Sequence, residues 1–342
     1  MSTRHDLRPA MARRLQCRAV ASGSIRLPAV PALLDDIQAQ CERTFTALGI
    51  DFTAEQQSHL RSVLAGQLEA AYAASPRAEL VFTYEVPVGF SVTYKVTVAI
   101  PSLGETYDRW VGSRQPPYFG VAPDARVMAL AMEAASPDDC PVLDIGAGTG
   151  RNALALARRG HPVDAIELSS AFATILREAA ARAVLPIRLI ERDVFSHREG
   201  LRDGSGLVLL SEVVSDFRST LELRQMFEIA AEHLAPGGRL LFNVFLPQPG
   251  YDPDAAAREL GLQVYTAIFT YAEIASAVAG LPLTLVGDDS VYDYEREHLP
   301  EGAWPPTYWY PDWVCGLDVF DVPRDDSPIT MRWLVWLKES EA

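Results

Sequence analysis

The residues best suited to chemistry lie around a glycine-rich stretch, VLDIGAGTGRN, at residues 142–152. An apolar run typical of a buried strand leads into Gly146, Gly148 and Gly150, and a helix is expected to begin near Arg151. Because glycine has no Cβ, the backbone can turn tightly there and approach a ligand closely. The free N–H groups at the start of the helix attract a carboxylate or phosphate. The stretch therefore predicts a small-molecule binding loop.

Acidic residues lie in or directly after the apolar runs that we interpret as parallel strands, and these residues are Asp144, Glu167, Asp193 and Glu212. Ligands of a doubly wound sheet bind at the carboxyl ends of its strands, so Glu167, which closes the second strand, is expected to face the crevice. Two simpler interpretations stay open. Glu167 could be the N-terminal charge of a helix over 170–183, and Asp193 could be a solvated turn residue.

The glycine spacing narrows the class of ligand. The pattern is G-x-G-x-G with an acid two positions before the first glycine, and it differs from the G-x-G-x-x-G of dinucleotide-binding proteins. It resembles motif I of class I S-adenosylmethionine (SAM) dependent methyltransferases, and the GRN ending is similar to tellurite-resistance and ubiquinone-type small-molecule methyltransferases. Pro236-Gly237-Gly238 before a fifth strand also matches that class. The resemblance covers roughly residues 104–287 and the last strand.

The resemblance implies SAM as cofactor and a role for each matching residue. Glu167 would accept hydrogen bonds from the ribose hydroxyls, and Asp193 with Val194 would contact the adenine. Tyr107, in a loop-like bridge over 104–120, would cover the cofactor, although this bridge could equally be a hydrophobic clasp between two units. The full set of cofactor-binding candidates is Asp144, Gly146, Ala147, Gly148, Gly150, Asn152, Glu167, Leu168, Asp193, Val194, Ser211 and Tyr107.

Methyl transfer from SAM is an in-line displacement in which the protein mainly aligns the reactants and excludes water. A base is needed only for an acceptor that arrives protonated. Glu212, Asp216 and His298 are the candidates, in that order. The Asn/Asp-Pro-Pro-aromatic motif of amino-directed DNA and protein glutamine methyltransferases is absent, which disfavours those substrates. No cluster of His, Cys, Asp and Glu suggests a metal, so a metal-assisted mechanism is not expected.

The segment 288–328 is a long insertion before the last strand, and such insertions are usually functional or disordered. It is rich in aromatic residues and carries eleven acidic side chains against two basic ones, −9 of the chain's net charge of −15. Aromatic faces beside carboxylates could hold an amine or another cation. Alternatively, the aromatics pack the insertion onto the sheet. The substrate-binding candidates are Trp110, Tyr308, Trp309 and Trp313.

Composition limits the other possibilities. A chain of 342 residues suggests about two domains. The net charge of −15 would repel a nucleic acid backbone, so nucleic acid is not an expected partner. The four cysteines are scattered, which is typical of a reducing cytoplasm and indicates neither a disulfide framework nor a zinc site. No apolar run approaches the ~18 residues of a membrane helix, so no membrane partner is expected.

The chain divides into three parts. Residues 1–28 carry five arginines within the first 22 positions and are interpreted as a basic flexible tail, with an organelle transit peptide as the alternative. Residues 29–103 predict a unit of two helices and a β-hairpin, in which a capping box at Thr53 and Gln56 starts the second helix. This unit either docks on the rest of the chain or forms a homodimer. Residues 104–342 form the catalytic domain.

These patterns predict an α/β protein with a doubly wound, seven-stranded Rossmann-like methyltransferase sheet, an N-terminal helix-helix-hairpin unit and a long insertion before the last strand. The expected activity is transfer of a methyl group from SAM to a nitrogen, oxygen or sulfur atom of a small metabolite in the cytoplasm. Three alternatives remain: methylation of protein or RNA, a non-catalytic SAM-binding partner, and, more remotely, a nucleotide-dependent oxidoreductase.

Overall fold

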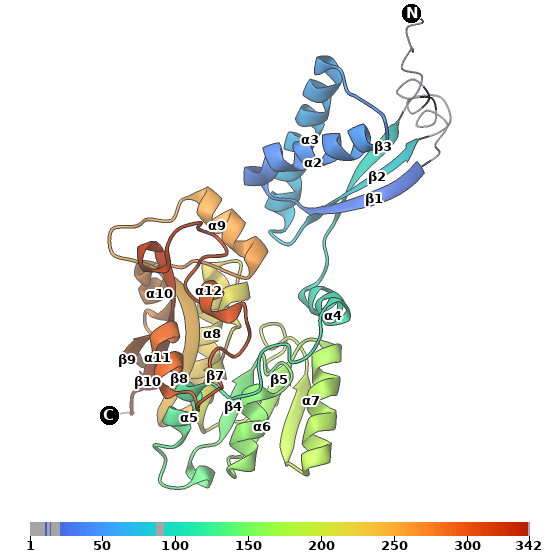
Figure 1. The fold of residues 1–342 in the computed structure, drawn as a ribbon. Coiled ribbons are helices and arrows are strands. Elements are labelled where there is room, and N and C mark those ends of the chain that lie inside the picture. The colour runs from blue at the N-terminus through green and yellow to red at the C-terminus, as the bar shows by residue number, and fades with distance from the viewer. Residues whose placement is uncertain (1–10, 12–13, 15–20, 87–91, 341–342) are drawn as a thin grey trace, which may run out of the picture. The chain divides into compact units, whose positions relative to one another are not determined.

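The computed structural model describes residues 11, 14, 21–86 and 92–340, and the chain forms two compact units, Met1–Ser102 and Leu103–Ala342 (Figure 1). Each unit has its own hydrophobic core, and the two are described separately. In the described residues, no helix is both long enough and apolar enough to cross a membrane.

The first unit packs two helices against one small antiparallel sheet. Helix α2 (Leu34–Ala47) and helix α3 (Ala54–Ala74) bury apolar side chains at three- and four-residue steps, among them Phe45. The capping box predicted at Thr53 is present: the Thr53 hydroxyl accepts the Gln56 N–H, and the Gln56 side chain accepts the Thr53 N–H. This reciprocal pair satisfies two N–H groups that would otherwise lack partners at the helix start.

The sheet of the first unit has three strands, one more than the predicted hairpin. Strands β2 (Glu79–Val86) and β3 (Thr93–Ala99) pair as expected, and β1 (Ala21–Pro28) pairs with the other edge of β2. Residues 21–28, expected to belong to a flexible tail, therefore form an ordered strand. Most of residues 1–20, and the turn at 87–91, lie outside the described residues. The missed signal was the short alternation of Ile25 and Leu27 with polar neighbours, which is typical of a half-buried strand.

The second unit is built on a seven-stranded sheet in the order β6-β5-β4-β7-β8-β10-β9, as expected. Five strands are parallel and β10 runs antiparallel between β8 and β9. The sequence order reverses between β4 and β7, and ligands of doubly wound sheets bind at such a switch point. The strands are β4 (Val142–Ile145), β5 (Val163–Glu167), β6 (Ile187–Glu191), β7 (Ser205–Leu210), β8 (Leu234–Pro247), β9 (Leu283–Ser290) and β10 (Ile329–Lys338).

Helices cover both faces of this sheet, and the burial of successive strand residues shows it. Along β7, Leu207 and Leu209 point into one core, and Val208 and Leu210 point into another. This period of two places a layer of helices on each side. The helices are α4 (Leu103–Ser113), α5 (Ala125–Ala131), α6 (Arg151–Arg158), α7 (Ser170–Ala183), α8 (Thr220–His233), α9 (Ala255–Gly261), α10 (Tyr271–Val278), α11 (Val291–His298) and α12 (Tyr310–Trp313).

Two segments differ from their sequence-based prediction. Residues 103–113, expected to be loop-like, form helix α4, because Leu103, Tyr107 and Trp110 recur at helical spacing and the helix-breaking prolines come only afterwards. The insertion before the last strand begins later than predicted, since β9 continues through residues 288–290 to Ser290. Helix α11 begins directly after that strand, so the first eight residues of the insertion are helical.

Candidate active site

The glycine-rich loop connects β4 to α6 at the switch point of the sheet. Gly146, Gly148 and Gly150 all have positive φ, at 74°, 55° and 90°. A Cβ at Gly146 would lie 2.4 Å from a methyl carbon of Val213, and one at Gly150 would lie 2.3 Å from a methyl carbon of Leu176. Because both the backbone conformation and the available space require glycine, the loop holds a tightly curved shape at the carboxyl end of β4.

Asp144 leads into this loop and carries an uncommitted oxygen. Its side chain is buried, and Oδ2 has no hydrogen-bond partner. Burial, together with the nearby carboxylates of Asp124 and Glu167, raises the pKa of Asp144 to about 7, against the opposing effect of Arg151. A buried polar atom without a partner is unusual in a folded protein, so we expect this oxygen to accept a hydrogen bond from a ligand or a water molecule.

Glu167 ends β5 and holds the loop from the side. Its Oε2 accepts the Gly148 N–H at 2.7 Å, and its Oε1 accepts the Ser169 N–H at 2.7 Å. Burial raises the pKa of Glu167, and these backbone N–H donors counteract part of that rise. The neighbouring Leu168 is half-buried and lies near Gly104 of α4. Glu167 therefore connects the strand end, the glycine loop and the start of α7.

Asp193 follows β6 and forms local hydrogen bonds. It accepts the Phe195 N–H at 2.9 Å and the Ser196 hydroxyl at 2.7 Å, while Val194 beside it is buried. These bonds are those of a turn-forming acid, the simpler of the two interpretations given above. Contact of Asp193 and Val194 with an adenine stays a prediction.

Helix α4 and the segment that follows it lie over the loop. The Tyr107 hydroxyl donates to Asp216, and the Ser169 hydroxyl donates to Asp108 at 2.8 Å. Phe119 lies against Gly148, whose ideal Cβ would be 3.3 Å from its ring, and it stacks on Trp110 with 5.3 Å between ring centroids. Burial and Asp216 raise the pKa of Tyr107 well above its usual value. This cover is formed by residues of the second unit alone.

Arg151, the first residue of α6, is the centre of a buried charged cluster. Its guanidinium lies 2.6 Å from Glu212 Oε1 and 3.0 Å from Asp124 Oδ1, and it donates to the Phe119 carbonyl at 2.9 Å. Asp124 also accepts hydrogen bonds from the Asn152 amide at 2.8 Å and the Ser211 hydroxyl at 2.6 Å. Arg151 and Asp124 were not among the predicted site residues, although the RN ending of the motif was the available signal.

Glu212 occupies the end of β7 in a strained conformation. Its φ is 59°, which is uncommon for a residue with a side chain. The Asn243 side chain accepts the Glu212 N–H at 2.7 Å, and the Ser215 hydroxyl donates to the Glu212 carbonyl at 3.1 Å. Burial raises the pKa of Glu212, and Arg151 opposes that rise. Strain held in place by such contacts is typical of functional sites.

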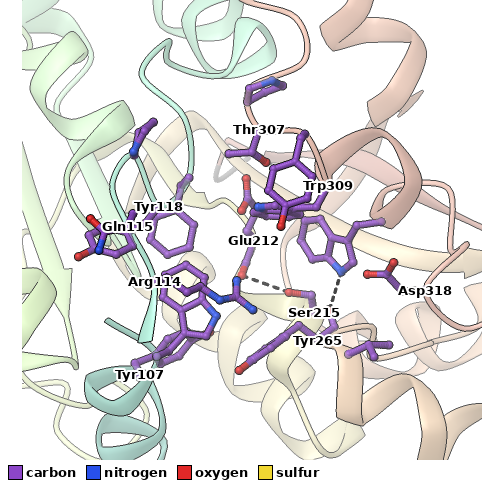
Figure 2. A pocket seen from close by; sticks show the side chains of 17 residues that line it. Tyr107, Arg114, Gln115, Tyr118, Glu212, Ser215, Tyr265, Thr307, Trp309 and Asp318 are labelled. Atoms are coloured by element: carbon purple, nitrogen blue, oxygen red, sulfur yellow. Dashed lines mark hydrogen bonds between the residues drawn. The ribbon is translucent and has the colours of Figure 1, made fainter. Parts of the chain in front are cut away.

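Beside Glu212 lies a cavity of about 630 Å³ with mostly aromatic walls (Figure 2). Three lining side chains are charged, namely Arg114, Glu212 and Asp318. The remaining lining residues are Tyr107, Trp110, Gln115, Pro117, Tyr118, Phe119, Ser215, Val264, Tyr265, Pro306, Thr307, Tyr308, Trp309 and Trp313. The four predicted substrate-binding residues are all part of this wall, and the cavity size suits a small molecule.

The insertion supplies one side of the cavity and is fixed to the rest of the unit. Glu295 of α11 accepts the N–H groups of Ala125 at 2.7 Å and Arg126 at 3.2 Å, and the Trp333 indole at 3.0 Å. Trp313 Nε1 donates to the Tyr265 carbonyl at 3.2 Å. The aromatic residues of the insertion therefore both pack it onto the sheet and line the cavity.

The comparisons with known proteins agree with this geometry. Residues 142–238 match the model of a family described as a methyltransferase domain. The matched segment lies within the second unit and runs from β4 through the glycine loop to the start of β8. No curated protein sequence matches the chain.

Solved structures of similar fold include other methyltransferases. Geranyl diphosphate C-methyltransferase from Streptomyces coelicolor A3(2), in complex with Mg²⁺, geranyl diphosphate and S-adenosyl-L-homocysteine, has 15% identity and a TM-score of 0.50, covering 70% of this chain and 99% of that one. A protein described as a sarcosine dimethylglycine methyltransferase from Galdieria sulphuraria has 15% identity and a TM-score of 0.48, covering 68% and 97%. At these identities the likeness concerns the fold.

The residues around the glycine loop fit SAM as a cofactor. The glycine loop provides a surface without side chains, and the uncommitted Asp144 oxygen lies beside it. Contact of Ala147, Asn152 and Ser211 with the cofactor stays a prediction, and the side chains of Asn152 and Ser211 donate hydrogen bonds to Asp124. Within the described ranges, no group of three His, Cys, Asp or Glu side chains is arranged to hold a metal ion.

The three candidate bases are placed differently in the methyltransferase domain. Glu212 lines the cavity. Asp216 is buried and accepts hydrogen bonds from Tyr107 and, at 3.4 Å, from Arg218, so it supports the cover instead of facing the cavity. His298 lies on the exposed side of α11, with its ring stacked on Tyr294 at 4.2 Å, and is not part of the cavity wall. His298 is therefore withdrawn as a candidate base, because a base must reach the reacting atom.

Proposed function

We propose that this chain transfers the methyl group of SAM to a nitrogen, oxygen or sulfur atom of a small molecule held in the aromatic cavity. The observation that supports it best is the position of the cavity. Its wall includes Glu212 at the carboxyl end of β7 and Phe119, which lies against the glycine loop. The cavity and the predicted SAM site are therefore adjacent and share part of one wall.

The chain's own residues supply alignment and exclusion of water. SAM brings an activated methyl group on a sulfonium, so the chemical step needs the acceptor atom in line with the methyl carbon and sulfur. We assign the glycine loop, Asp144 and Glu167 to holding the donor, with Tyr107 covering it. The aromatic walls formed by Trp110, Trp309 and their neighbours would orient the acceptor and exclude water from the reacting atoms.

The size and walls of the cavity favour a small acceptor over a macromolecule. An aromatic-lined pocket of this size suits one compact molecule, and the net charge of −15 disfavours an RNA backbone. Protein methylation and a non-catalytic SAM-binding role remain the alternatives. A cytoplasmic location and a homodimer formed through residues 29–103 stay predictions from the sequence.

The first experiment is a calorimetric titration of the full chain with SAM, with S-adenosylhomocysteine and with NAD. We expect binding of both adenosyl ligands with a dissociation constant on the order of micromolar, and none of NAD. Glu167→Gln should weaken SAM binding by about tenfold or more, because a lost hydrogen bond to a charged group costs about 1.5–3 kcal/mol. Glu178→Gln, an exposed position on α7, is the matched control and should bind SAM normally.

Different results would point elsewhere. If Glu167→Gln and Glu178→Gln, both folded by circular dichroism, bound SAM as the wild type does, Glu167 would not hold the donor. If neither adenosyl ligand bound the wild type, the assignment of the glycine loop would be wrong. Binding of SAM without transfer of labelled methyl to any small molecule would favour the non-catalytic alternative.

A further inference from the structure

Glu212 presents one committed and one uncommitted oxygen at the cavity. Oε1 is held 2.6 Å from the Arg151 guanidinium, whereas no hydrogen bond engages Oε2 within the described part of the chain. The strained backbone of Glu212 and its bond to Asn243 fix where this carboxylate lies. Because Glu212 lines the cavity, Oε2 is available to accept a hydrogen bond from a molecule inside it.

Thr307 contributes a second uncommitted polar atom to the same wall. Its Oγ1 is buried and has no hydrogen-bond partner, and Thr307 lines the same cavity as Glu212, where Figure 2 labels both. The turn that carries Thr307 is held on both sides: the Tyr310 N–H donates to the Thr307 carbonyl at 3.3 Å, and Pro306 packs closely against Gly120. An unpaired buried hydroxyl costs about 1–3 kcal/mol, so a hydrogen bond between Thr307 and a bound molecule would recover that free energy.

The charges around this polar pair disfavour a strongly charged acceptor. Arg114 is the one cationic side chain among the described lining residues, and its guanidinium already lies over the Trp110 ring at 4.1 Å. One exposed arginine is too little to neutralise a diphosphate buried in an aromatic cavity. An ammonium group bound at Glu212 would be repelled by Arg151, which pairs with the same carboxylate, and by Arg114 in the cavity wall.

We propose that the methyl acceptor is a neutral, ring-bearing compound whose hydroxyl group lies between Glu212 and Thr307. This inference rests on the proposed function and specifies its substrate class. A hydroxyl can donate its proton to Glu212 Oε2 and accept a hydrogen bond from Thr307 at the same time, so it satisfies both groups. The aromatic walls bind the ring system and the polar pair selects the hydroxyl.

The reaction then balances with groups present in the site. The acceptor oxygen forms a bond to the methyl carbon, the bond between that carbon and sulfur breaks, and sulfur keeps the electron pair. The hydroxyl proton passes to Glu212 Oε2. Burial of Glu212 supports this role, because it raises the pKa of the carboxyl and makes it a better proton acceptor. The products are a methyl ether, S-adenosylhomocysteine and a proton that Glu212 later releases to water.

The test measures transfer of labelled methyl from SAM by the full chain to compounds that share a ring system and differ in the reacting group. The probes are naphthol, naphthylamine and naphthalenethiol, with umbelliferone as a second hydroxyl compound and geranyl diphosphate as the charged one. We expect label on naphthol and umbelliferone, and at least tenfold less on the others. Label on the amine, the thiol or the diphosphate in preference to both hydroxyl compounds overturns the proposal.

Variants separate recognition from folding. Thr307→Val keeps the shape of the side chain and should raise KM for the hydroxyl acceptor about tenfold with little change in kcat. Glu212→Gln should lower kcat about a hundredfold and remove the fall in rate at low pH, where the Glu212 carboxylate of the wild type becomes protonated. Thr330→Val, in the partly buried strand β10, is the matched control and should leave KM and kcat unchanged.

Two outcomes distinguish this inference from the proposed function. If SAM binds but neither hydroxyl compound is methylated, or if Thr307→Val changes KM no more than Thr330→Val does, the hydroxyl acceptor is wrong while the donor site stands. If SAM itself does not bind, the proposed function is wrong, and this inference is wrong with it.

Discussion

At the scale of single residues, Arg151 joins the two halves of the proposed site. One guanidinium contacts Glu212 in the cavity wall, Asp124 ahead of α5 and the carbonyl of Phe119 in the cover over the glycine loop. Removing one partner of a buried ion pair leaves an unpaired charge, which costs several kcal/mol. Arg151, Glu212 and Asp124 therefore hold one another in position. The geometry of the donor side and the acceptor side therefore depends on one side chain.

Asp144 makes a prediction for the pH dependence of stability in the absence of SAM. Its pKa is raised to about 7 in the folded chain, against about 3.9 in an unfolded chain. From about pH 4 to pH 7 the folded state keeps a proton that the unfolded state has lost, so the free energy of unfolding falls as pH rises. Asp144→Asn removes this contribution, and its free energy of unfolding should fall less between pH 5 and pH 8.

Urea denaturation at the two pH values checks this. Glu295, whose pKa is also raised to about 7, remains in the variant, so the slope should decrease without vanishing. Equal slopes for the wild type and Asp144→Asn would show that Asp144 titrates normally in the folded chain.

Single residues also show what sequence could and could not predict. Asp144 and Glu167 are recognisable because they keep a fixed distance from the glycines. Asp124 and Thr307 are not, because their contacts join segments far apart in the chain, and Arg151 was missed although it lies in the motif itself. His298 was a candidate on residue type alone, and its exposed position on α11 could not be read from its neighbours.

At the scale of elements, α11 acts as a clamp on α5. Glu295 accepts two N–H groups at the start of α5 and the indole N–H of Trp333 in β10. The first N–H groups of a helix have no partner within the helix. A carboxylate there accepts hydrogen bonds from them and also interacts favourably with the positive end of the helix dipole. The buried side chain of Glu295 thus holds the insertion, helix α5 and strand β10 together.

Glu295→Ala should therefore destabilise the second unit by about 3 kcal/mol, because it leaves three donors without an acceptor. Amide hydrogen exchange at Ala125 and Arg126 should become faster than in the wild type. Glu297→Ala, an exposed position on the same helix, is the control and should change neither the stability nor the exchange. Unchanged exchange at Ala125 and Arg126 in Glu295→Ala would contradict the clamp.

The elements missed by the sequence-based predictions share a physical cause. Strand β1 alternates only weakly between apolar and polar residues, and it becomes a strand because β2 offers an unpaired edge. Helix α4 was taken for a loop because polar residues surround its few aromatic ones, and its order comes from packing against α7. By contrast, the seven strands of the sheet were predictable because apolar residues dominate them, and β4, β5 and β7 each lead through a turn into a helix.

At the scale of the whole molecule, the two units have separate cores. Every described residue of the cavity wall and of the glycine loop belongs to Leu103–Ala342. SAM should therefore stabilise the second unit. At a hundredfold excess over the dissociation constant the gain is about 2.7 kcal/mol, which corresponds to a rise of roughly 5–10 °C in the unfolding midpoint of a unit this size.

Differential scanning calorimetry with and without SAM measures this shift. Hydrogen exchange in α3 provides the control, since its protected amides lie beside Leu60, Leu64 and Leu68 in the core of the first unit. Their protection should not change with SAM. A SAM-dependent increase in protection of α3 equal to that of β4 would show that the two units unfold together.

The ends of the insertion lie close to each other, and this has a consequence for how the protein can diversify. Ser290, where the chain leaves the sheet, pairs directly with Arg332 of the strand on which it returns. A segment that begins and ends on neighbouring strands closes its loop whatever its length, at a cost that grows only slowly with the number of residues. The segment can therefore be lengthened or shortened at little cost, and under the proposed function such a change would alter the acceptor site while the strand register and the glycine loop stay the same.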